Sequence, residues 1–255
     1  MSKLSVIFED SNLLVVNKPS GVVVNNSDTT AHTTTLQDMV ASYLHVPSNP
    51  TRLITQRKEG EWENPEDAFV NRCGIVHRLD KETSGALLVA KTLEAFIALQ
   101  KEFKDRVVEK TYVALSHGKI TPVQGEISVP VGRLEFNRKR FGIVAGGRES
   151  LTVYRVESYF ENPKTKEILS LVTLFPKTGR THQIRVHLQY IGHPIFGDEL
   201  YAGRKIARND RKILQRVFLH AAHISFLHPV TQKKMEFSAP LPEELETVLS
   251  QLKKQ

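Results

Sequence analysis

The chain has 255 residues and a mass of 28.9 kDa, enough for one large domain or two small ones. Hydrophobic residues make up 40% of it and charged residues 25%, which argues against a disordered tail or a collagen-like fibre. Because 35 Lys and Arg residues outnumber 28 Asp and Glu residues, the formal charge is +7, and this excess favours a polyanionic partner.

The sequence shows no sign of export or of a membrane anchor. Cys73 is the single cysteine, so no internal disulfide or cysteine-based zinc site can form, and a reducing cytoplasm is the expected compartment. The apolar residues 4–8 are followed at once by Glu9 and Asp10, which makes this segment too short for a signal peptide. No run approaches the ~18 apolar residues of a membrane span. We therefore expect a cytoplasmic protein that does not associate with membranes.

The first third of the chain predicts two strands and a helix. The strands cover residues 5–8 and 13–17 and are separated by turn-forming residues. Thr35 with Asp38 three positions later is a capping-box pattern, and it predicts a helix that buries Leu36, Met39, Val40 and Leu44. Residues 47–71 lose all periodicity, so we expect a long surface insertion there.

The rest of the chain predicts several strands and three helices. Residues 85–91 read as a strand, and Thr92 is placed to cap a helix with Leu93, Phe96, Ile97 and Phe103 on its buried face. Further strands are expected over residues 110–116, 126–129, 151–159 and 168–175, and a helix over 181–191 that Gly192 closes. The last helix has Pro242 as its first residue and ends near Lys253 and Lys254, which suit its C-terminal dipole.

This order of elements predicts an α+β fold. Strands outnumber helices, and several neighbouring strands are joined by links too short for a helical crossover. We therefore expect a mostly antiparallel, mixed sheet with flanking helices. The sequence has no internal repeat and no shift in composition, so residues 1–255 are expected to form a single domain.

Two stretches concentrate polar residues that can carry chemistry. Residues 74–85 place seven polar or charged residues between apolar runs, where the carboxylate of Asp80 either lies at the floor of a cleft or bonds its own backbone in an Asx turn. Residues 177–185 follow a strand and open a helix, so Arg180 either pairs with a carboxylate or phosphate or belongs to a solvated basic face. On composition alone, Tyr112 is a core or rim aromatic.

Basic residues gather in two further places. Residues 137–141 include Arg138, Lys139 and Arg140. Residues 200–216 hold six cations against one acid, Asp210, namely Arg204, Lys205, Arg208, Arg211, Lys212 and Arg216. Each cluster alone is compatible with a solvated face, but two clusters in a chain with a pI near 9.4 favour phosphate binding.

The sequence offers no site for a metal or a nucleotide cofactor. On a helix, His182 and His187 diverge by about 140°, and His193 lies beyond the helix end. No HExxH, GxGxxG or GxxxxGK[ST] pattern occurs. We expect no metal and no cofactor.

Five segments, in order along the chain, resemble the motifs of RluA-type pseudouridine synthases. Residues 17–21 (Asn-Lys-Pro-Ser-Gly) resemble the first motif, 77–85 (His-Arg-Leu-Asp-Lys-Glu-Thr-Ser-Gly) the catalytic motif and 110–112 (Lys-Thr-Tyr) the tyrosine motif. Residues 179–188 resemble the arginine motif, and Leu219-His220-Ala221 through His228-Pro229 the closing one. The resemblance implies the catalytic-domain fold of that family and the isomerisation of uridine to pseudouridine in ribosomal or transfer RNA. It implies neither metal nor organic cofactor.

The same resemblance implies a role for each site residue. Asp80 is the essential carboxylate, and whether it attacks C1′ or removes a ribose proton stays open. Full burial would raise the pKa of the Asp80 carboxylate by up to ~3–5 units, and Arg180 supplies a positive charge that opposes this rise. Tyr112 stacks beside the uracil. Because the uridine must leave the RNA stack, Arg78 is expected to fill the gap. Leu219 either contacts the flipped ring or belongs to the core.

Many family members carry an N-terminal S4 RNA-binding domain, whereas the first motif begins here at Asn17. We therefore expect residues 1–255 to be a stand-alone, monomeric catalytic domain. We expect it to bind RNA through the two basic clusters, residues 137–141 and the cluster that contains Arg204, Lys205 and Arg208, and through the 47–71 insertion. One alternative is a catalytically silent RNA-binding or ribosome-assembly factor, which would have lost Asp80, Tyr112 or Arg180. Another is a metal-free hydrolase, for which Asp80 has no paired carboxylate in these motifs.

Overall fold

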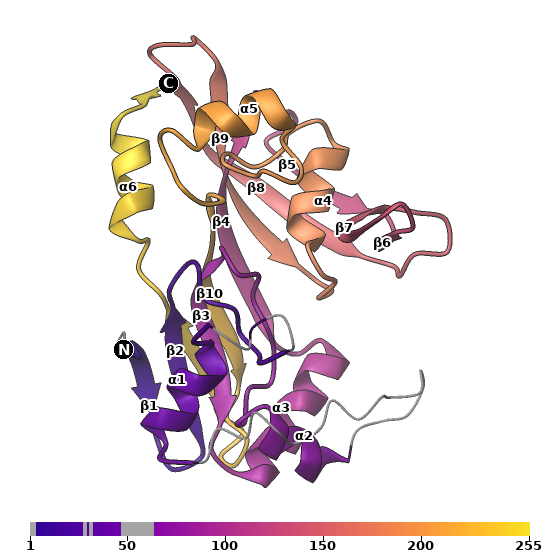
Figure 1. Cartoon of the computed structure of the whole chain (residues 1–255), viewed down its shortest axis with the longest axis vertical. Helices are drawn as coiled ribbons and strands as arrows, with labels where there is room; N and C mark the ends of the chain where they lie inside the picture. Colours follow the sequence, from indigo (N-terminus) through magenta and orange to yellow (C-terminus); the bar gives the residue numbers. More distant parts are fainter. Residues whose placement is uncertain (1–3, 28–29, 31–32, 47–63) are drawn as a thin grey trace. The chain divides into compact units, whose positions relative to one another are not determined.

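The computed structural model describes residues 4–27, 30, 33–46 and 64–255. Residues 47–63, most of the predicted insertion, lie outside the described residues. The fold is α+β and is built mainly from antiparallel strand pairs, as the sequence predicts (Figure 1). The chain divides into two compact units: unit 1 has residues 1–108 and 224–239, and unit 2 has residues 109–223 and 240–255. No helix within the described ranges is long and apolar enough to cross a bilayer.

Unit 1 combines strands with three helices. Its elements are β1 (Val6–Glu9), β2 (Leu13–Lys18), α1 (Leu36–Tyr43), α2 (Pro65–Asn71), β3 (Ser84–Ala90), α3 (Leu93–Asp105), β11 (Lys234–Ser238) and residues 224–227 of β10 (Leu219–Leu227). The strands pair in the order β1, β2, β3 and β10, and β11 also pairs with β10. Helix α3 packs on both α2 and β3.

The core of unit 1 forms between α3 and the apolar strands. All seven residues of β3 are buried, as expected for an apolar run that is covered on both faces. Helix α3 begins where the Thr92 hydroxyl accepts a hydrogen bond from Ala95 N at 3.2 Å, and it buries Phe96. Ile224 and Phe226 of β10 join the same core, so a distant part of the chain completes it.

Unit 2 holds the remaining elements. These are β4 (Glu109–His117), β5 (Gln124–Ser128), β6 (Val131–Leu134), β7 (Asn137–Ile143), β8 (Leu151–Glu161), β9 (Ile168–Pro176), α4 (Gln183–Tyr190), α5 (Arg204–Asp210), residues 219–223 of β10, α6 (Glu243–Ser250) and β12 (Lys253–Lys254). The main strands pair in the order β10, β4, β9, β8 and β12, and β5 also pairs with β8. Strands β6 and β7 form a separate antiparallel hairpin.

The core of unit 2 is assembled from the central strands and two helices. Val172 and Leu174 of β9 are fully buried and share a cluster with Leu188 of α4 and Leu245 of α6. Fully burying one such side chain contributes about 1.5–3 kcal/mol, so this cluster is a major source of stability. Helix α4 ends as predicted, because Gly192 follows its C-cap with a left-handed φ of 84°.

Three expectations about the helices are corrected. Ile97 is 45% exposed because the buried stripe of α3, which includes Phe96, lies on the other side of the helix. Pro242 is the N-cap of α6 rather than its first residue, since its ψ of 142° is extended. Lys253 and Lys254 pair with β8 as strand β12 instead of ending the helix.

Several described elements had no counterpart in the sequence prediction. Helix α2 occupies residues 65–71 of the expected insertion, where the Asn64 side chain caps it. Helix α5, the β6–β7 hairpin and strands β10 and β11 also went unpredicted. Apart from β10, these segments are short or rich in charge, so they carry too little hydrophobic periodicity to be recognised locally. Strand β10 has nine residues without Asp, Glu, Lys or Arg, and its apolar residues are a sufficient local signal for a strand.

Candidate functional site

Asp80 lies in a tight turn of unit 1 that leads into β3. Thr83 N donates a hydrogen bond to the main-chain carbonyl of Asp80 at 3.1 Å and so closes the turn. Leu79 is only 5% exposed, whereas Asp80 is half-buried and Arg78 is exposed. Leu79 thus anchors the turn, and the two polar side chains that flank it remain accessible.

The first motif holds this turn from the end of β2. The Lys18 side chain is fully buried, and its Nζ donates to the carbonyl oxygens of Pro19, Val22 and Lys81 at 2.8, 2.7 and 3.0 Å. Lys81 directly follows Asp80 in the chain. The buried amine therefore fixes the backbone next to the predicted catalytic carboxylate.

Two more hydrogen bonds join the same segments. Ser20 Oγ donates to the carbonyl of Glu82 at 2.8 Å, and Gly21 N donates to the carbonyl of Lys81 at 2.9 Å. Gly21 has a φ of 83°, a conformation that glycine adopts without steric cost. The motif over residues 17–21 is thus a structural support for the Asp80 turn.

His77 fixes the other side of the turn. Leu88 N donates to His77 Nε2 at 2.9 Å, which requires that nitrogen to be unprotonated. The imidazole also packs on Phe103 with 4.7 Å between ring centroids. The exposed side chain of Arg78 is therefore presented from a firmly held backbone.

Arg180 lies between β9 and α4 of unit 2, in a turn organised by the buried side chain of Gln183. Gln183 Oε1 accepts hydrogen bonds from Arg180 N at 3.0 Å and from Thr178 Oγ1 at 2.7 Å. Gln183 Nε2 donates to Leu151 O and to Thr152 Oγ1, each at 3.0 Å. Both ends of this amide are engaged, so the turn is tied to the start of β8.

The two arginines of this motif have different environments. Arg180 is half-buried, and its Nε donates to the carbonyl of Glu149 at 3.2 Å. Arg185 is buried and forms a two-pronged pair with Asp198, with Nε to Oδ2 at 2.7 Å and Nη2 to Oδ1 at 2.9 Å. Its guanidinium also lies 5.0 Å from the Tyr201 ring. Arg185 is therefore structural, whereas Arg180 is the more exposed of the two arginines.

Tyr112 lies on β4 opposite Leu174 of β9, half-buried against the core of unit 2. Lys110 lies two residues earlier, so both side chains leave the strand on the same face. Burial lowers the pKa of the Lys110 amine below its usual value. The tyrosine motif thus presents an aromatic ring and a partly desolvated amine from one face of one strand.

The basic residues of 200–216 divide into two groups. Arg204, Lys205, Arg208 and Lys212 are exposed on α5 or just beyond it. Arg216, in contrast, is 4% exposed and places Nη1 2.7 Å from Glu244 Oε1. Arg216 therefore stabilises the interior and does not belong to the predicted phosphate-binding surface.

Leu219 is 3% exposed and belongs to the core cluster of unit 2. Its carbonyl accepts a hydrogen bond from Arg216 Nη2 at 2.8 Å. This burial favours the core alternative over contact with a substrate.

The predicted residues fall into separate groups. Asp80 and Arg78 share one turn of unit 1, whereas Tyr112, Arg180 and the exposed cations of α5 belong to unit 2. Sequence reasoning assigned no role to Lys18, Gln183 or Asp198, although these side chains position the turns. The one available signal was a lysine at the end of an apolar run, and a lysine in such a position is usually exposed.

The described residues contain no group of three or more His, Cys, Asp or Glu side chains arranged to hold a metal. His182 Nδ1 lies 2.9 Å from Tyr201 Oη, and His193 Nδ1 lies 2.8 Å from the carbonyl of His117. His187 is fully buried in α4, and burial lowers its pKa to about 4. The three histidines therefore have separate surroundings.

Comparison with known proteins identifies the family. A family model described as RNA pseudouridylate synthase matches residues 12–190. The ribosomal large subunit pseudouridine synthase D of Zymomonas mobilis is 36% identical over 98% of this chain and 73% of its own length. An uncharacterized RNA pseudouridine synthase of Bacillus subtilis is 33% identical over 96% of this chain and 71% of its own length. The solved structure of Human RNA Pseudouridylate Synthase Domain Containing 1 matches with a TM-score of 0.72 at 28% identity, covering 99% of this chain and 89% of that chain. The chain therefore belongs to the RNA pseudouridylate synthase family, which isomerises uridine in RNA to pseudouridine.

Proposed function

We propose that this enzyme modifies specific uridines of large-subunit ribosomal RNA and that Asp80 is its essential carboxylate. The observation that carries the second part is the support of the Asp80 turn by three hydrogen bonds from residues 18–21. The names of its relatives, several of them ribosomal large subunit pseudouridine synthases, support the choice of RNA. Transfer RNA is the second candidate substrate. We further infer a monomer that works in the cytoplasm.

The reaction balances without an oxidant or a cofactor. The N1–C1′ bond breaks, the uracil turns and C5 joins C1′, while C5 loses a proton and N1 gains one. Asp80 must be ionised for either step open to it, attack on C1′ or removal of the ribose C2′ proton. A uridine deuterated at C2′ distinguishes the two, because only proton removal at that carbon slows with deuterium.

Other residues act on the substrate in this proposal. Tyr112 contacts the uracil, and Arg180 supplies positive charge at the reacting nucleotide. Taking a uridine out of a stacked helix costs a few kcal/mol, and Arg78 offsets part of this cost by filling the gap.

Asp80→Asn tests the role of the carboxylate, because the amide keeps the size of the side chain but removes its charge. We expect no release of tritium from a large-subunit ribosomal RNA transcript labelled at uridine C5, whereas RNA binding and thermal unfolding stay as in the wild type. Asp67→Asn makes the same change at an exposed position of α2 and is the control. Turnover of Asp80→Asn within tenfold of the wild type would refute the assignment.

The substrate is tested separately. Pseudouridine is mapped at single-nucleotide resolution in total RNA from cells that lack the protein. Loss of modification at a large-subunit ribosomal site is expected. If modification disappears only from a transfer RNA, the proposed substrate is wrong while the reaction stands.

A further inference from the structure

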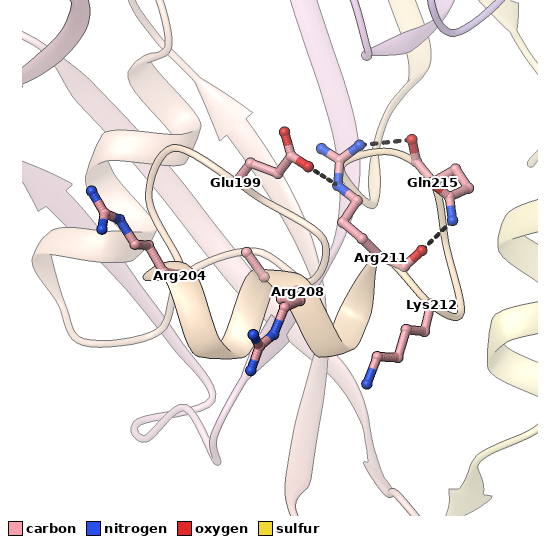
Figure 2. A pocket seen from close by; sticks show the side chains of 7 residues that line it. Glu199, Arg204, Arg208, Arg211, Lys212 and Gln215 are labelled. Atoms are coloured by element: carbon pink, nitrogen blue, oxygen red, sulfur yellow. Dashed lines mark hydrogen bonds and ion pairs between the residues drawn. The ribbon is translucent and has the colours of Figure 1, made fainter.

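An open groove of about 520 Å³ lies along α5 in unit 2 (Figure 2). None of its lining residues is assigned to the chemistry above. Four cations line the groove, and among its lining residues there is one carboxylate. The lining consists of Glu199, Arg204, Ala207, Arg208, Arg211, Lys212 and Gln215.

Helical spacing brings the exposed cations together. Arg204 and Arg208 are four residues apart on α5, so they lie on one face of the helix, and Lys212 follows just beyond its end. Figure 2 shows the Arg208 and Lys212 side chains projecting in the same direction. Like charges at this spacing repel one another and destabilise a helix. An anionic partner that neutralises them relieves this repulsion.

The opposite face of α5 is fixed to unit 2 by Asp210. This residue is 5% exposed, and its Oδ2 accepts a hydrogen bond from Gly197 N at 2.9 Å. The same oxygen lies 2.9 Å from His117 Nε2, and Glu167 Oε1 lies 2.8 Å from His117 Nδ1. The helix is therefore attached to β4 through a buried histidine held between two carboxylates.

Arg211 forms a pre-organised part of the groove. Its Nε donates to Gly197 O and its Nη1 to Gln215 O, both at 2.7 Å. The side chain is 14% exposed, whereas that of Glu199 is 64% exposed, with its Oε1 3.8 Å from Arg211 Nε. A cation held in place in this way loses little conformational entropy when it binds an anion.

We propose that this groove binds the phosphodiester backbone of the RNA substrate. The inference rests on the proposed function for the nature of the polyanion. Guanidinium groups match phosphate oxygens in a two-pronged geometry, and the lysine adds a point charge. Lys205 is exposed on α5 but does not line the groove. It therefore increases the positive electrostatic potential near the groove but is not expected to contact the bound phosphates.

A triple variant, Arg204→Gln, Arg208→Gln and Lys212→Gln, tests the site. The affinity for a fluorescein-labelled RNA stem-loop is measured by anisotropy across a range of KCl concentrations. Each phosphate contact contributes about −0.7 to −0.9 to the slope of log affinity against log salt, so the slope should flatten by about 2–3. If the two proteins bind equally at 1 M salt, this corresponds to binding that is about 100- to 1,000-fold weaker at 0.1 M.

A matched control removes the same total charge elsewhere in unit 2. It combines Lys164→Gln, Lys253→Gln and Lys254→Gln, three exposed lysines outside the groove. We expect its salt slope to stay close to the wild-type value. If both triple variants weaken binding equally, or if the groove variant changes nothing, the proposal is wrong.

Glu199→Gln gives an independent test that does not remove any cation. Loss of the groove carboxylate should tighten RNA binding and steepen its salt dependence, and weaker binding would contradict the proposal. Circular dichroism and thermal unfolding verify that each variant is folded. If a polyglutamate peptide of equal charge binds more tightly than the stem-loop, the groove serves an acidic protein instead of RNA.

The binding assay does not depend on catalysis. If the wild-type protein binds RNA through the groove but releases no tritium from uridine C5, the proposed function is refuted while the proposal that the groove binds RNA still holds. An active enzyme whose groove variant binds RNA normally would refute the groove alone.

Discussion

Lys18 shows how a single buried side chain can support the backbone of the turn that holds Asp80. Its amine satisfies three carbonyl oxygens, one of them at Lys81, 63 positions along the chain. The apolar stem fills space at the end of β2, and the polar end replaces the water that these carbonyls would otherwise bind. The buried side chain of Lys18 therefore helps to hold the backbone next to Asp80 in place.

Lys18→Met keeps the stem and removes all three hydrogen bonds. The Lys81 carbonyl keeps its hydrogen bond from Gly21 N, whereas the carbonyls of Pro19 and Val22 lose the donor that Lys18 supplies. A buried carbonyl left without a donor costs about 1–3 kcal/mol, so we expect a clear loss of stability and a kcat at least tenfold lower at a temperature where the variant is still folded. Thermal unfolding and tritium release from uridine C5 measure the two effects. Lys81→Met is the control, because that side chain is exposed while its carbonyl is retained. A folded Lys18→Met with wild-type kcat would limit Lys18 to a role in stability.

Arg78→Ala tests whether the exposed arginine helps a uridine leave the stack. We expect turnover to fall more on a closed stem-loop than on an open strand of the same target sequence, by about tenfold, or about 1.4 kcal/mol, because only the stem-loop must be unstacked. Single-turnover rates on the two RNAs provide the comparison. Lys81→Ala removes an exposed cation from the same turn and should not discriminate between them. An equal loss on both RNAs for Arg78→Ala would point to a phosphate contact.

At the scale of elements, His117 joins β4 to the end of α5. Burial by itself lowers the pKa of this imidazole, but hydrogen bonds and charge interactions with Asp210 and Glu167 outweigh burial and raise it to about 9. The folded pKa thus lies above the unfolded value of about 6.5. The protonated His117 imidazole therefore contributes its full stabilisation of the folded state below pH 6.5, and this contribution is lost as the pH rises through 9.

His117→Gln should abolish the part of the pH dependence of folding stability that comes from this imidazole. Between pH 6.5 and 9, we expect the unfolding free energy of the wild type to fall by up to about 3 kcal/mol more than that of the variant. Urea unfolding at a series of pH values gives the difference between the two proteins. His45→Gln changes an exposed histidine and should follow the wild type. Parallel profiles for wild type and His117→Gln would show that the imidazole is not charged in the folded state.

At the scale of the whole molecule, neither unit is a continuous piece of chain. Residues 224–239 return to unit 1, where Ile224, Phe226 and Ala239 belong to its core. The chain must therefore extend well into unit 2 before unit 1 can be completed. This arrangement makes the contacts of unit 1 strongly non-local, which slows folding.

A fragment of residues 1–108 should consequently fail to fold by itself. Removing a buried Ile or Phe side chain costs about 2–5 kcal/mol, and the loss of both consumes most of the 5–15 kcal/mol typical of a domain. Near-ultraviolet circular dichroism and the cooperativity of thermal unfolding provide the measurement. The same fragment joined to residues 224–239 by a flexible linker is the control and should regain cooperative unfolding. Cooperative unfolding of the short fragment would show that β10 and β11 are dispensable.

The sequence alone determined the elements with strong local signals. Thr35 and Asp38 form the predicted capping box, Thr92 caps α3, and Gly192 ends α4. These features depend on residues within a few positions of one another, so local chemistry is enough to place them. The order of the motifs likewise determined the family and the reaction.

Only the tertiary structure decided which polar residues are buried and which meet the solvent. Lys18 and Arg216 are interior, whereas Arg204 and Arg208 are exposed, although all four are cations that look alike in the sequence. The sequence left two roles for Leu219, a core residue or a substrate contact, and its 3% exposure in the structure favours the core. The physical reason is that burying a polar group depends on partners far along the chain, such as the Lys81 carbonyl for Lys18. Sequence patterns record the residue but not the partners that folding brings to it.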